Sequence, residues 1–375
     1  MKKLIYLLLL FIAAATSSCG EKNEPAPPPA EVERTVLVYM VAHNNLGQRG
    51  WDAADISEMR TAASAGGLHG GRLLVMHQNS EGNSVLKEIN SRGEVDTLFV
   101  YGADGTSVSI ARMRRVFDDM RRLAPARHYG LVLWSHGTGW LQNGISDPDD
   151  TRRRAFGLDG AGQMNVTALS RAVEGQNFDF IYFDCCHMAS VEVAYEMRHA
   201  TPLIIGSVAE LPNPGMPYDE NIPLLMQGKA TDAAANTFRS YDELHGSSRT
   251  CTMSAIATAG LDRLAAATRA LYATAAPLPA GTMPQHFERT SRCRLYDLLH
   301  YAELIGTDAA AMDEFRAALA DVVLYQAATP FIFNDITVSR HSGLSTFVVK
   351  DADDMNERGY SSLKWASDVA SSLPL

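Results

Sequence analysis

Two segments of this 375-residue chain end in residues that could carry out nucleophilic catalysis. The segment 131–140 (LVLWSHGTGW) delivers a histidine, His136, into a glycine-rich turn. The segment 180–190 (FIYFDCCHMAS) delivers two adjacent cysteines, Cys185 and Cys186, into a turn of small residues. A thiolate attacks a carbonyl carbon, and a nearby imidazole passes the proton to the leaving group. A cysteine and a histidine within reach of each other are therefore the minimum that this chemistry needs.

The two cysteines differ in the side of the strand to which they point. Because side chains alternate along an extended chain, Asp184 and Cys186 face one side, whereas Phe183 and Cys185 face the other. An apolar Phe183 belongs in the core, which predicts a buried, inert thiol at Cys185 and makes Cys186 the better nucleophile. We also expect a helix at 188–198, and the amino end of a helix lowers the pKa of a nearby thiol.

The elements that must position these residues alternate between strands and helices. Apolar, β-branched runs at 35–41, 128–134 and 178–183 are typical of strands buried on both faces. Helical patterns at 107–123 and 166–174 lie between them along the chain. The alternation predicts an α/β fold with a mostly parallel sheet and helices on both faces.

Functional groups of an open parallel sheet collect at the carboxyl ends of its strands. The strands that precede His136 and Cys186 both end at that rim, and neighbouring strands lie about 4.8 Å apart. We therefore expect the imidazole and the thiol to meet if the two strands are neighbours.

The composition predicts how the rest of the chain is divided. A core is predicted at 34–260, and 261–375 is predicted to be a helix-rich region packed on that core, because Ala and Leu recur there at helical spacing.

The first 33 residues have the composition of an export signal and a linker. Lys2 and Lys3 precede an apolar run at 4–15, and small residues then lead to Cys19. The segment 1–18 is similar to a bacterial lipoprotein signal, in which Cys19 becomes the acylated first residue of the mature chain. Four prolines between positions 25 and 29 mark 19–33 as an extended tether. We therefore expect a lipid-anchored protein of the cell envelope, on the periplasmic or surface face of the outer membrane.

The charge of the chain argues against a nucleic-acid partner. After loss of the first 18 residues, 31 basic and 43 acidic residues remain, a net charge of −12, with no basic run that could neutralise phosphates. The histidines show no metal-ligand spacing, and paired Cys-x-x-Cys motifs are absent from the sequence, so no metal cofactor is expected.

Three motifs together resemble the clostripain family of bacterial cysteine peptidases, which is grouped with the caspases and gingipains. They are VLVYMVAHNNL at 36–46, WSHGTGW at 134–140, and FDCCHM at 183–188 followed by SVEVAYE at 190–196. The resemblance implies a caspase-haemoglobinase-like α/β fold and cleavage of peptide bonds after Arg or Lys. It implies no organic cofactor, although some members of the family require Ca²⁺.

The resemblance also assigns roles to individual residues. His136 would be the general base and Cys186 the nucleophile, acting as a dyad. The backbone N–H of Gly137 would help to stabilise the oxyanion, because a residue without a side chain allows close approach. Asp184 would lie in the pocket for the residue before the cleaved bond, where a carboxylate pairs with a guanidinium or ammonium group.

The loop at 210–218 (ELPNPGMPY) departs from the family pattern because it lacks a Trp that relatives carry. Glu210 is a second candidate acid for the substrate pocket, and a solvated loop residue is the equal alternative. The missing Trp puts a strict preference for Arg or Lys in question more than it does catalysis.

A polar stretch at 147–155 holds three consecutive arginines, Arg152, Arg153 and Arg154. Some relatives cut themselves after a basic residue in this interval, so the stretch is either a self-cleavage site or a solvated run of charge. Its aspartates could offer oxygen ligands to Ca²⁺, but they lack the spacing of a recognised calcium loop.

The sequence thus predicts an exported cysteine endopeptidase that acts on proteins or peptides with basic residues. The mechanism would be acyl transfer through a thioester. The alternative is a catalytically weak or inactive surface lipoprotein that uses the same fold to bind a peptide or a glycan, and the altered loop at 210–218 is its main support.

Overall fold

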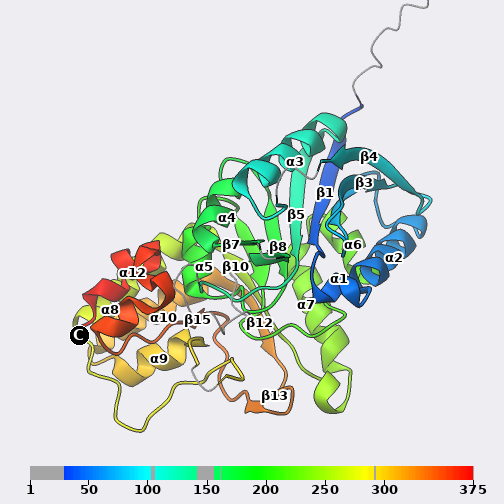
Figure 1. Ribbon diagram of the computed structural model, residues 1–375. Helices are drawn as coiled ribbons and strands as arrows, with labels where there is room; N and C mark the ends of the chain where they lie inside the picture. The colour runs from blue at the N-terminus through cyan, green and yellow to red at the C-terminus, as the bar shows by residue number, and fades with distance from the viewer. Residues whose placement is uncertain (1–28, 103–105, 142–155, 161, 291–292, 375) are drawn as a thin grey trace, which may run out of the picture.

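A nine-stranded sheet forms the centre of the molecule (Figure 1). The computed structural model describes residues 29–102, 106–141, 156–160, 162–290 and 293–374. Within these ranges the strand order is β12-β10-β9-β8-β5-β1-β2-β3-β4. The strands are β1 (Val32–Val41), β2 (Arg72–Gln78), β3 (Ser84–Ile89), β4 (Val95–Tyr101), β5 (Ala126–Trp134), β8 (Phe180–Asp184), β9 (Leu203–Gly206), β10 (Thr252–Ala257) and β12 (Val323–Ala328).

The middle of the sheet is parallel and its edges are antiparallel. Strands β9, β8, β5, β1 and β2 run parallel to one another. Strands β3, β4, β10 and β12 pair in the antiparallel sense. The register places Trp134 at the end of β5 between Met40 of β1 and Asp184 of β8. The strands that precede His136 and Cys186 are therefore neighbours, as expected, and their carboxyl ends share one rim.

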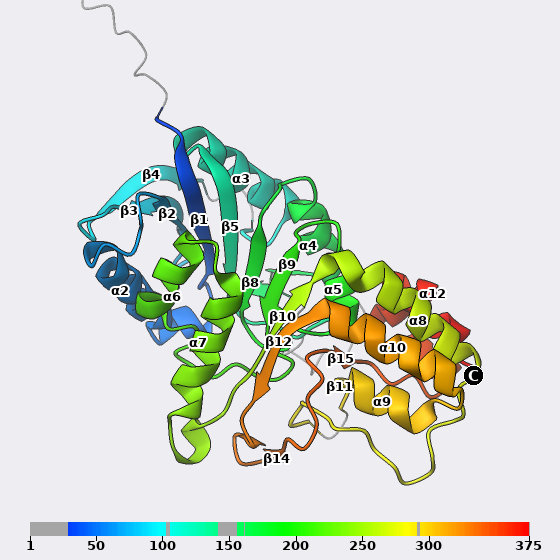
Figure 2. The same ribbon diagram turned by 180° about the vertical axis from the view of Figure 1, so that it is seen from behind.

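Helices cover both faces of the sheet (Figures 1 and 2). Along β1, Leu37 and Tyr39 join one apolar core, whereas Val36 and Val38 join the other, which explains the unbroken apolar run of this strand. The first core is completed by α3 (Ile110–Leu123), α4 (Val166–Val173), α5 (Val191–Glu196) and α8 (Leu261–Ala273), and the second by α2 (Trp51–Ser64), α6 (Tyr218–Met226) and α7 (Ala230–Asp242). The predicted α/β fold with a mostly parallel sheet and helices on both faces is confirmed.

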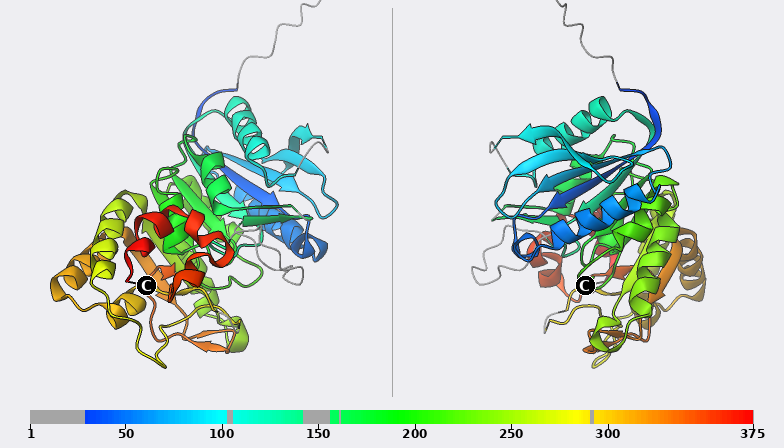
Figure 3. Two further views of the ribbon diagram at one scale, coloured as in Figure 1. Left: turned by 60° about the vertical axis from the view of Figure 1, so that its left-hand side comes forward. Right: turned by 90° about the vertical axis from the view of Figure 1, so that its right-hand side faces the viewer.

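The last third of the chain is helical but also contributes a strand to the central sheet. Its elements group on one side of the molecule, with the end of the chain among them (Figure 3). Strand β12 pairs with β10 although its sequence lies within the stretch expected to be helical. The elements of this region beyond α8 are β11 (Tyr296–Asp297), α9 (Leu298–Ile305), α10 (Ala309–Val322), β12, β13 (Phe331–Ile332), β14 (Ile336–Thr337), β15 (Ser345–Thr346), α11 (Ala352–Met355), a 3₁₀ helix (Glu357–Ser362), α12 (Lys364–Asp368) and a 3₁₀ helix (Ala370–Ser372).

Shorter elements complete the fold at the rim and between the larger ones. They are α1 (Asn45–Gln48), directly after β1, the hairpin β6 (Phe156–Asp159) and β7 (Gly162–Met164), and two 3₁₀ turns at Gly246–Ser248 and Thr258–Gly260. In the described ranges, no helix is both long enough and apolar enough to cross a membrane. The predicted signal, Cys19 and the arginines 152–154 lie outside the described residues.

Candidate active site

His136 is carried by a turn that is tied to the end of the neighbouring strand. The hydroxyl of Ser135 donates to the carbonyl of Val41 at 2.9 Å and accepts the backbone N–H of Leu158 at 3.1 Å. These bonds fix the chain one residue before His136. The imidazole is half-buried, and its Nε2 lies 2.6 Å from the side-chain oxygen of Asn45.

Cys186 lies two residues beyond the end of β8. Cys185 is 4% exposed and joins the same core as Phe183, as the alternation of side chains predicts. Cys186 is half-buried, and its thiol donates to the carbonyl of Leu211 at 3.7 Å. Both cysteines are free thiols.

A cavity of about 110 Å³ brings three of the predicted site residues together. Its wall contains His136, Cys186 and Asp184, together with Trp134 from the end of β5. The loop 211–215 closes the opposite side. Residues at or just beyond the ends of β5 and β8, 48 or more positions apart in sequence, thus meet because the two strands are neighbours.

The thiol of Cys186 is uncharged in this arrangement. Burial raises its pKa to about 12, and the nearby carboxylates of Glu210 and Asp184 act in the same direction, whereas the guanidinium of Arg289 opposes the rise. The thiol donates to Leu211 and the imidazole contacts Asn45, so neither of these bonds joins the two groups. In the structure the thiol proton is therefore directed at the Leu211 carbonyl.

The helix after Cys186 begins later than expected. Helix α5 starts at Val191, not at 188, because the Ser190 hydroxyl caps it by accepting the N–H of Val193 at 3.2 Å. The field of a helix terminus falls off within one turn. The helix therefore does little for the thiol, and this part of the sequence interpretation was wrong.

Asp184 is buried and lies on the cavity wall. Its carboxylate accepts the backbone N–H of Met216 at 3.1 Å and the hydroxyl of Tyr218 at 2.8 Å. Burial nevertheless raises the pKa of Asp184 to about 7, and the two hydrogen bonds limit the rise. A carboxylate with two fixed donors and one side toward a cavity is suited to receive a cation.

A second buried acid, Asp55, contacts Trp134, which lines the cavity. Asp55 was not predicted from the sequence. The indole N–H of Trp134 donates to its Oδ2 at 2.6 Å, while its Oδ1 is buried and unpartnered in the described part of the chain. Burial raises the pKa of Asp55 to about 9, and the charge of Asp184 adds to the rise. The available signal was its helical spacing from Met59, which places it on the buried stripe of α2.

Gly137 lies where the two strand ends come closest. A Cβ at this position would lie 2.4 Å from the carbonyl oxygen of Cys186 and 3.1 Å from the sulfur of Cys185. Any side chain would therefore push the turn of His136 away from the turn of Cys186. The prediction that this position needs a glycine for close approach agrees with this geometry. The role of the Gly137 N–H toward an oxyanion stays a prediction.

Glu210 lies near the thiol, but its carboxylate is held by an arginine. Nε of Arg289 donates to Glu210 at 3.0 Å, and the same guanidinium donates to Asp335 at 3.2 Å and covers the ring of Phe333. The residues of the described chain that line the cavity do not include Glu210. Sequence reasoning missed Arg289, because nothing in its local pattern connects it with a loop 79 positions away.

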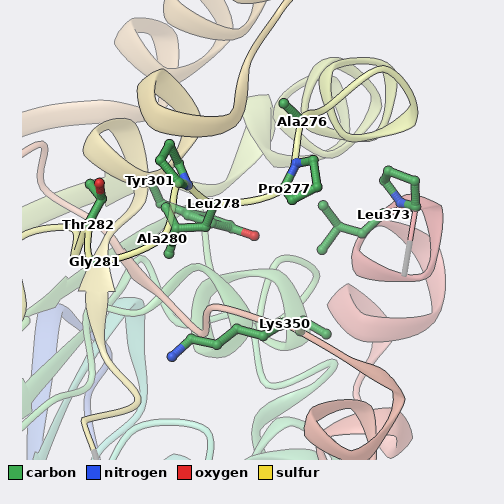
Figure 4. Close-up of a pocket in the computed structure, with 12 residues that line it drawn as sticks. Ala276, Pro277, Leu278, Ala280, Gly281, Thr282, Tyr301, Lys350 and Leu373 are labelled. Carbon is green, nitrogen blue, oxygen red and sulfur yellow. The ribbon is translucent and has the colours of Figure 1, made fainter.

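Other parts of the described structure offer less for catalysis. A larger cavity of about 370 Å³ lies between the 276–282 loop and the end of the chain (Figure 4). Its wall includes Pro277, Leu278, Tyr301 and Lys350 but neither a cysteine nor a histidine. Across the residues that the structure covers, no three His, Cys, Asp or Glu side chains gather as a metal ion would require. Of these two cavities, the smaller one is the one whose described wall holds both a cysteine and a histidine.

Comparison with known proteins identifies the family. The model of the clostripain family matches residues 38–326. An inactive zymogen of a C11 protease from Parabacteroides distasonis is 28% identical, with a TM-score of 0.78 over 91% of this chain and 99% of that one. A secreted C11 cysteine protease from Bacteroides thetaiotaomicron, solved with an irreversible peptide inhibitor, is 26% identical, with a TM-score of 0.77 over 90% and 99% of the two chains. No protein with a curated description matches.

These matches extend over most of the chain. The family suggested by the three motifs is confirmed, and so is the caspase-like fold that it implied. The chain therefore belongs to the clostripain family of cysteine proteases.

Proposed function

We propose that the protein is an endopeptidase that cleaves after Arg or Lys, with Cys186 as nucleophile and His136 as general base. The observation that carries this proposal is the single cavity whose wall holds the thiol, the imidazole and the carboxylate of Asp184. These are the groups needed to attack a peptide carbonyl and to recognise a basic side chain beside it.

The reaction starts when the thiol leaves the carbonyl of Leu211 and transfers its proton to His136. The thiolate then attacks the peptide carbonyl carbon, and backbone N–H groups at Gly137 and Cys186 stabilise the oxyanion. Collapse of this intermediate breaks the C–N bond, and the imidazolium protonates the leaving amine. Water, deprotonated by His136, hydrolyses the resulting thioester and regenerates the thiol.

Asp184 is the proposed specificity residue. A guanidinium or ammonium group that enters the cavity would favour its charged form and lower its pKa from about 7. Glu210 is the proposed second acid, and a basic substrate side chain would have to compete with Arg289 for it.

We further propose that the protein is exported and lipid-anchored through Cys19, and that it cuts itself after one of the arginines 152–154. Detergent phase partitioning of wild type and Cys19→Ala tests the anchor, because only an acylated chain enters the detergent phase.

Self-cleavage predicts two fragments for purified wild type and an intact Cys186→Ala variant. If both proteins stay whole, self-processing is wrong.

Fluorogenic peptides with Arg, Lys or a neutral residue before the cleaved bond test the proposed reaction. The assay uses wild type and Cys186→Ala under reducing conditions, with and without Ca²⁺. We expect turnover of the Arg and Lys peptides by wild type alone. The hydrogen bond from the Cys186 thiol to Leu211 and the altered loop at 210–218 favour one other function, a module that binds a peptide or a glycan without cleaving it. Wild-type turnover no higher than that of Cys186→Ala would support this alternative.

A further inference from the structure

The imidazole of His136 has a partner on a different element of the rim. Helix α1 begins directly after β1, and Asn45 is its first residue. The side-chain oxygen of Asn45 lies 2.6 Å from Nε2 of His136. Because β1 and β5 are paired neighbours, this contact joins the end of one parallel strand to the end of the next.

The backbone that carries Asn45 is firmly held although the side chain itself is exposed. The oxygen of the Asn44 side chain caps the helix by accepting the N–H of Leu46 at 2.8 Å. The nitrogen of the same side chain donates to the carbonyls of Val41 at 2.9 Å and Leu158 at 2.8 Å. These three bonds fix the direction in which α1 leaves β1.

Gly47 fixes the distance between α1 and the strand. A Cβ at Gly47 would lie 2.0 Å from the carbonyl oxygen of Ala42, so the helix packs on the strand end more closely than any other residue would allow. The position of Asn45 relative to His136 is thus set by buried contacts and not by the surface.

The contact has a consequence for the chemistry of the imidazole. A carboxamide oxygen is an acceptor, so the nitrogen that faces it carries the hydrogen. A neutral imidazole has one N–H, and a hydrogen on Nε2 leaves the lone pair on Nδ1. Asn45 therefore leaves Nδ1 as the nitrogen that can take a proton from a thiol. Its bond to Nε2 also holds the imidazole ring in one orientation.

We propose that Asn45 is the positioning residue for His136, a third member of what the sequence presents as a dyad. The inference rests on the proposed role of His136 as general base. Because an amide is uncharged, Asn45 orients the base without the strong rise in proton affinity that a carboxylate would cause.

Three variants test the proposal with an Arg fluorogenic peptide. Asn45→Ala removes the acceptor, Asn45→Asp keeps an acceptor and adds a charge, and Gln48→Ala is the matched control, an exposed residue at the other end of the same helix. In Asn45→Ala we expect kcat to fall by about 10- to 100-fold, by analogy with the range found for side chains that orient metal-bound histidines. The KM and the melting temperature should stay close to those of wild type, because the Asn45 side chain is exposed and is not among the described residues that line the cavity.

The pH profile gives a readout that a merely structural role would not move. Asn45→Asp should recover most of the lost kcat and shift the acidic limb of the kcat/KM profile to higher pH, because a negative charge raises the pKa of a neighbouring imidazole. The other titratable groups on the described cavity wall, Asp184, Cys185 and Cys186, are unchanged in all three variants. Gln48→Ala should match wild type in every measurement.

Two results overturn the inference while leaving the proposed function intact. One is an active wild type with an equally active Asn45→Ala, and the other is an Asn45→Asp variant that is no better than Asn45→Ala. A wild type whose turnover does not depend on Cys186 overturns the proposed function, and the positioning role falls with it.

Discussion

At the scale of single residues, the buried acid Asp55 makes the stability of the protein depend on pH. The carboxyl is fully buried, and burial raises its pKa to about 9. In the unfolded chain the same group loses its proton near pH 4. Between these two values the folded state keeps a proton that the unfolded state has released, so the free energy of unfolding falls as pH rises.

Replacing Asp55 with Asn should therefore flatten the dependence of stability on pH. The slope between pH 5 and pH 8 should become shallower by up to about 1.4 kcal/mol per pH unit, the contribution of one proton. Urea denaturation at pH 5, 6.5 and 8 measures this slope. Asp232→Asn, an exposed acid on α7, is the control and should keep the wild-type slope. Equal slopes for wild type and Asp55→Asn would show that Asp55 is ionised in the fold.

Only some residues of the site and its surroundings could be predicted from the sequence. His136, Cys186 and Asp184 were predicted because they follow recognisable strands and belong to motifs, and one cavity holds all three. Asp55 and Arg289 were missed because their importance depends on partners far away in the chain, Trp134 and Glu210. No local pattern encodes such pairs.

At the scale of elements, the site depends on how closely the ends of β5 and β8 approach. Gly137 allows this approach, since a Cβ there would lie 2.4 Å from the backbone oxygen of Cys186. A backbone atom cannot move aside as a flexible side chain can.

Gly137→Ala should therefore separate the imidazole from the thiol. We expect kcat/KM to fall at least about 10-fold and stability to fall by about 1–3 kcal/mol, the usual cost of overpacking. Steady-state kinetics and urea denaturation measure the two effects. Gly206→Ala, at the end of β9 on the same sheet, is the control, because its Cβ would meet its nearest neighbour at an ordinary 3.4 Å. Wild-type kinetics in Gly137→Ala would contradict this account of the rim.

Elements buried on both faces were the ones that the sequence predicted well. Strands β1, β5 and β8 have unbroken apolar runs because two cores pack against them. Strand β12, in the region predicted to be helix-rich, was not predicted, since its half-buried edge position leaves no such run and its partner β10 lies about 70 residues earlier in the chain. The antiparallel direction of the edge strands likewise depends on tertiary contacts and not on local pattern.

At the scale of the whole molecule, the C-terminal region supports the turn that carries His136. Trp140, four residues beyond that histidine, packs its ring against Phe347 and Tyr360 with centroid distances of 4.9 Å to each. All three rings are buried in the core on one face of the sheet. The region 261–375 is thus continuous with the core that positions the site.

Removing one of these rings should destabilise the protein as a whole. Tyr360→Ala should lower the free energy of unfolding by about 3–5 kcal/mol, as expected when a large buried aromatic side chain is deleted. Denaturant unfolding measures the loss, and activity should disappear in the same transition. Phe331→Ala, an aromatic residue of the same region that is 46% exposed, should cost far less. Equal stability of Tyr360→Ala and wild type would mean that the C-terminal region folds apart from the core.

The central claim is that a thiol at Cys186 attacks carbonyl carbons next to basic residues. Its most direct test is covalent labelling with an irreversible peptide inhibitor that presents Arg before a thiol-reactive carbonyl group, followed by peptide mapping by mass spectrometry. We predict one adduct, on Cys186, that forms faster than with a neutral analogue and is lost in Cys186→Ala. An adduct on Cys185, Cys251 or Cys293 instead, or no adduct at all, would contradict the account.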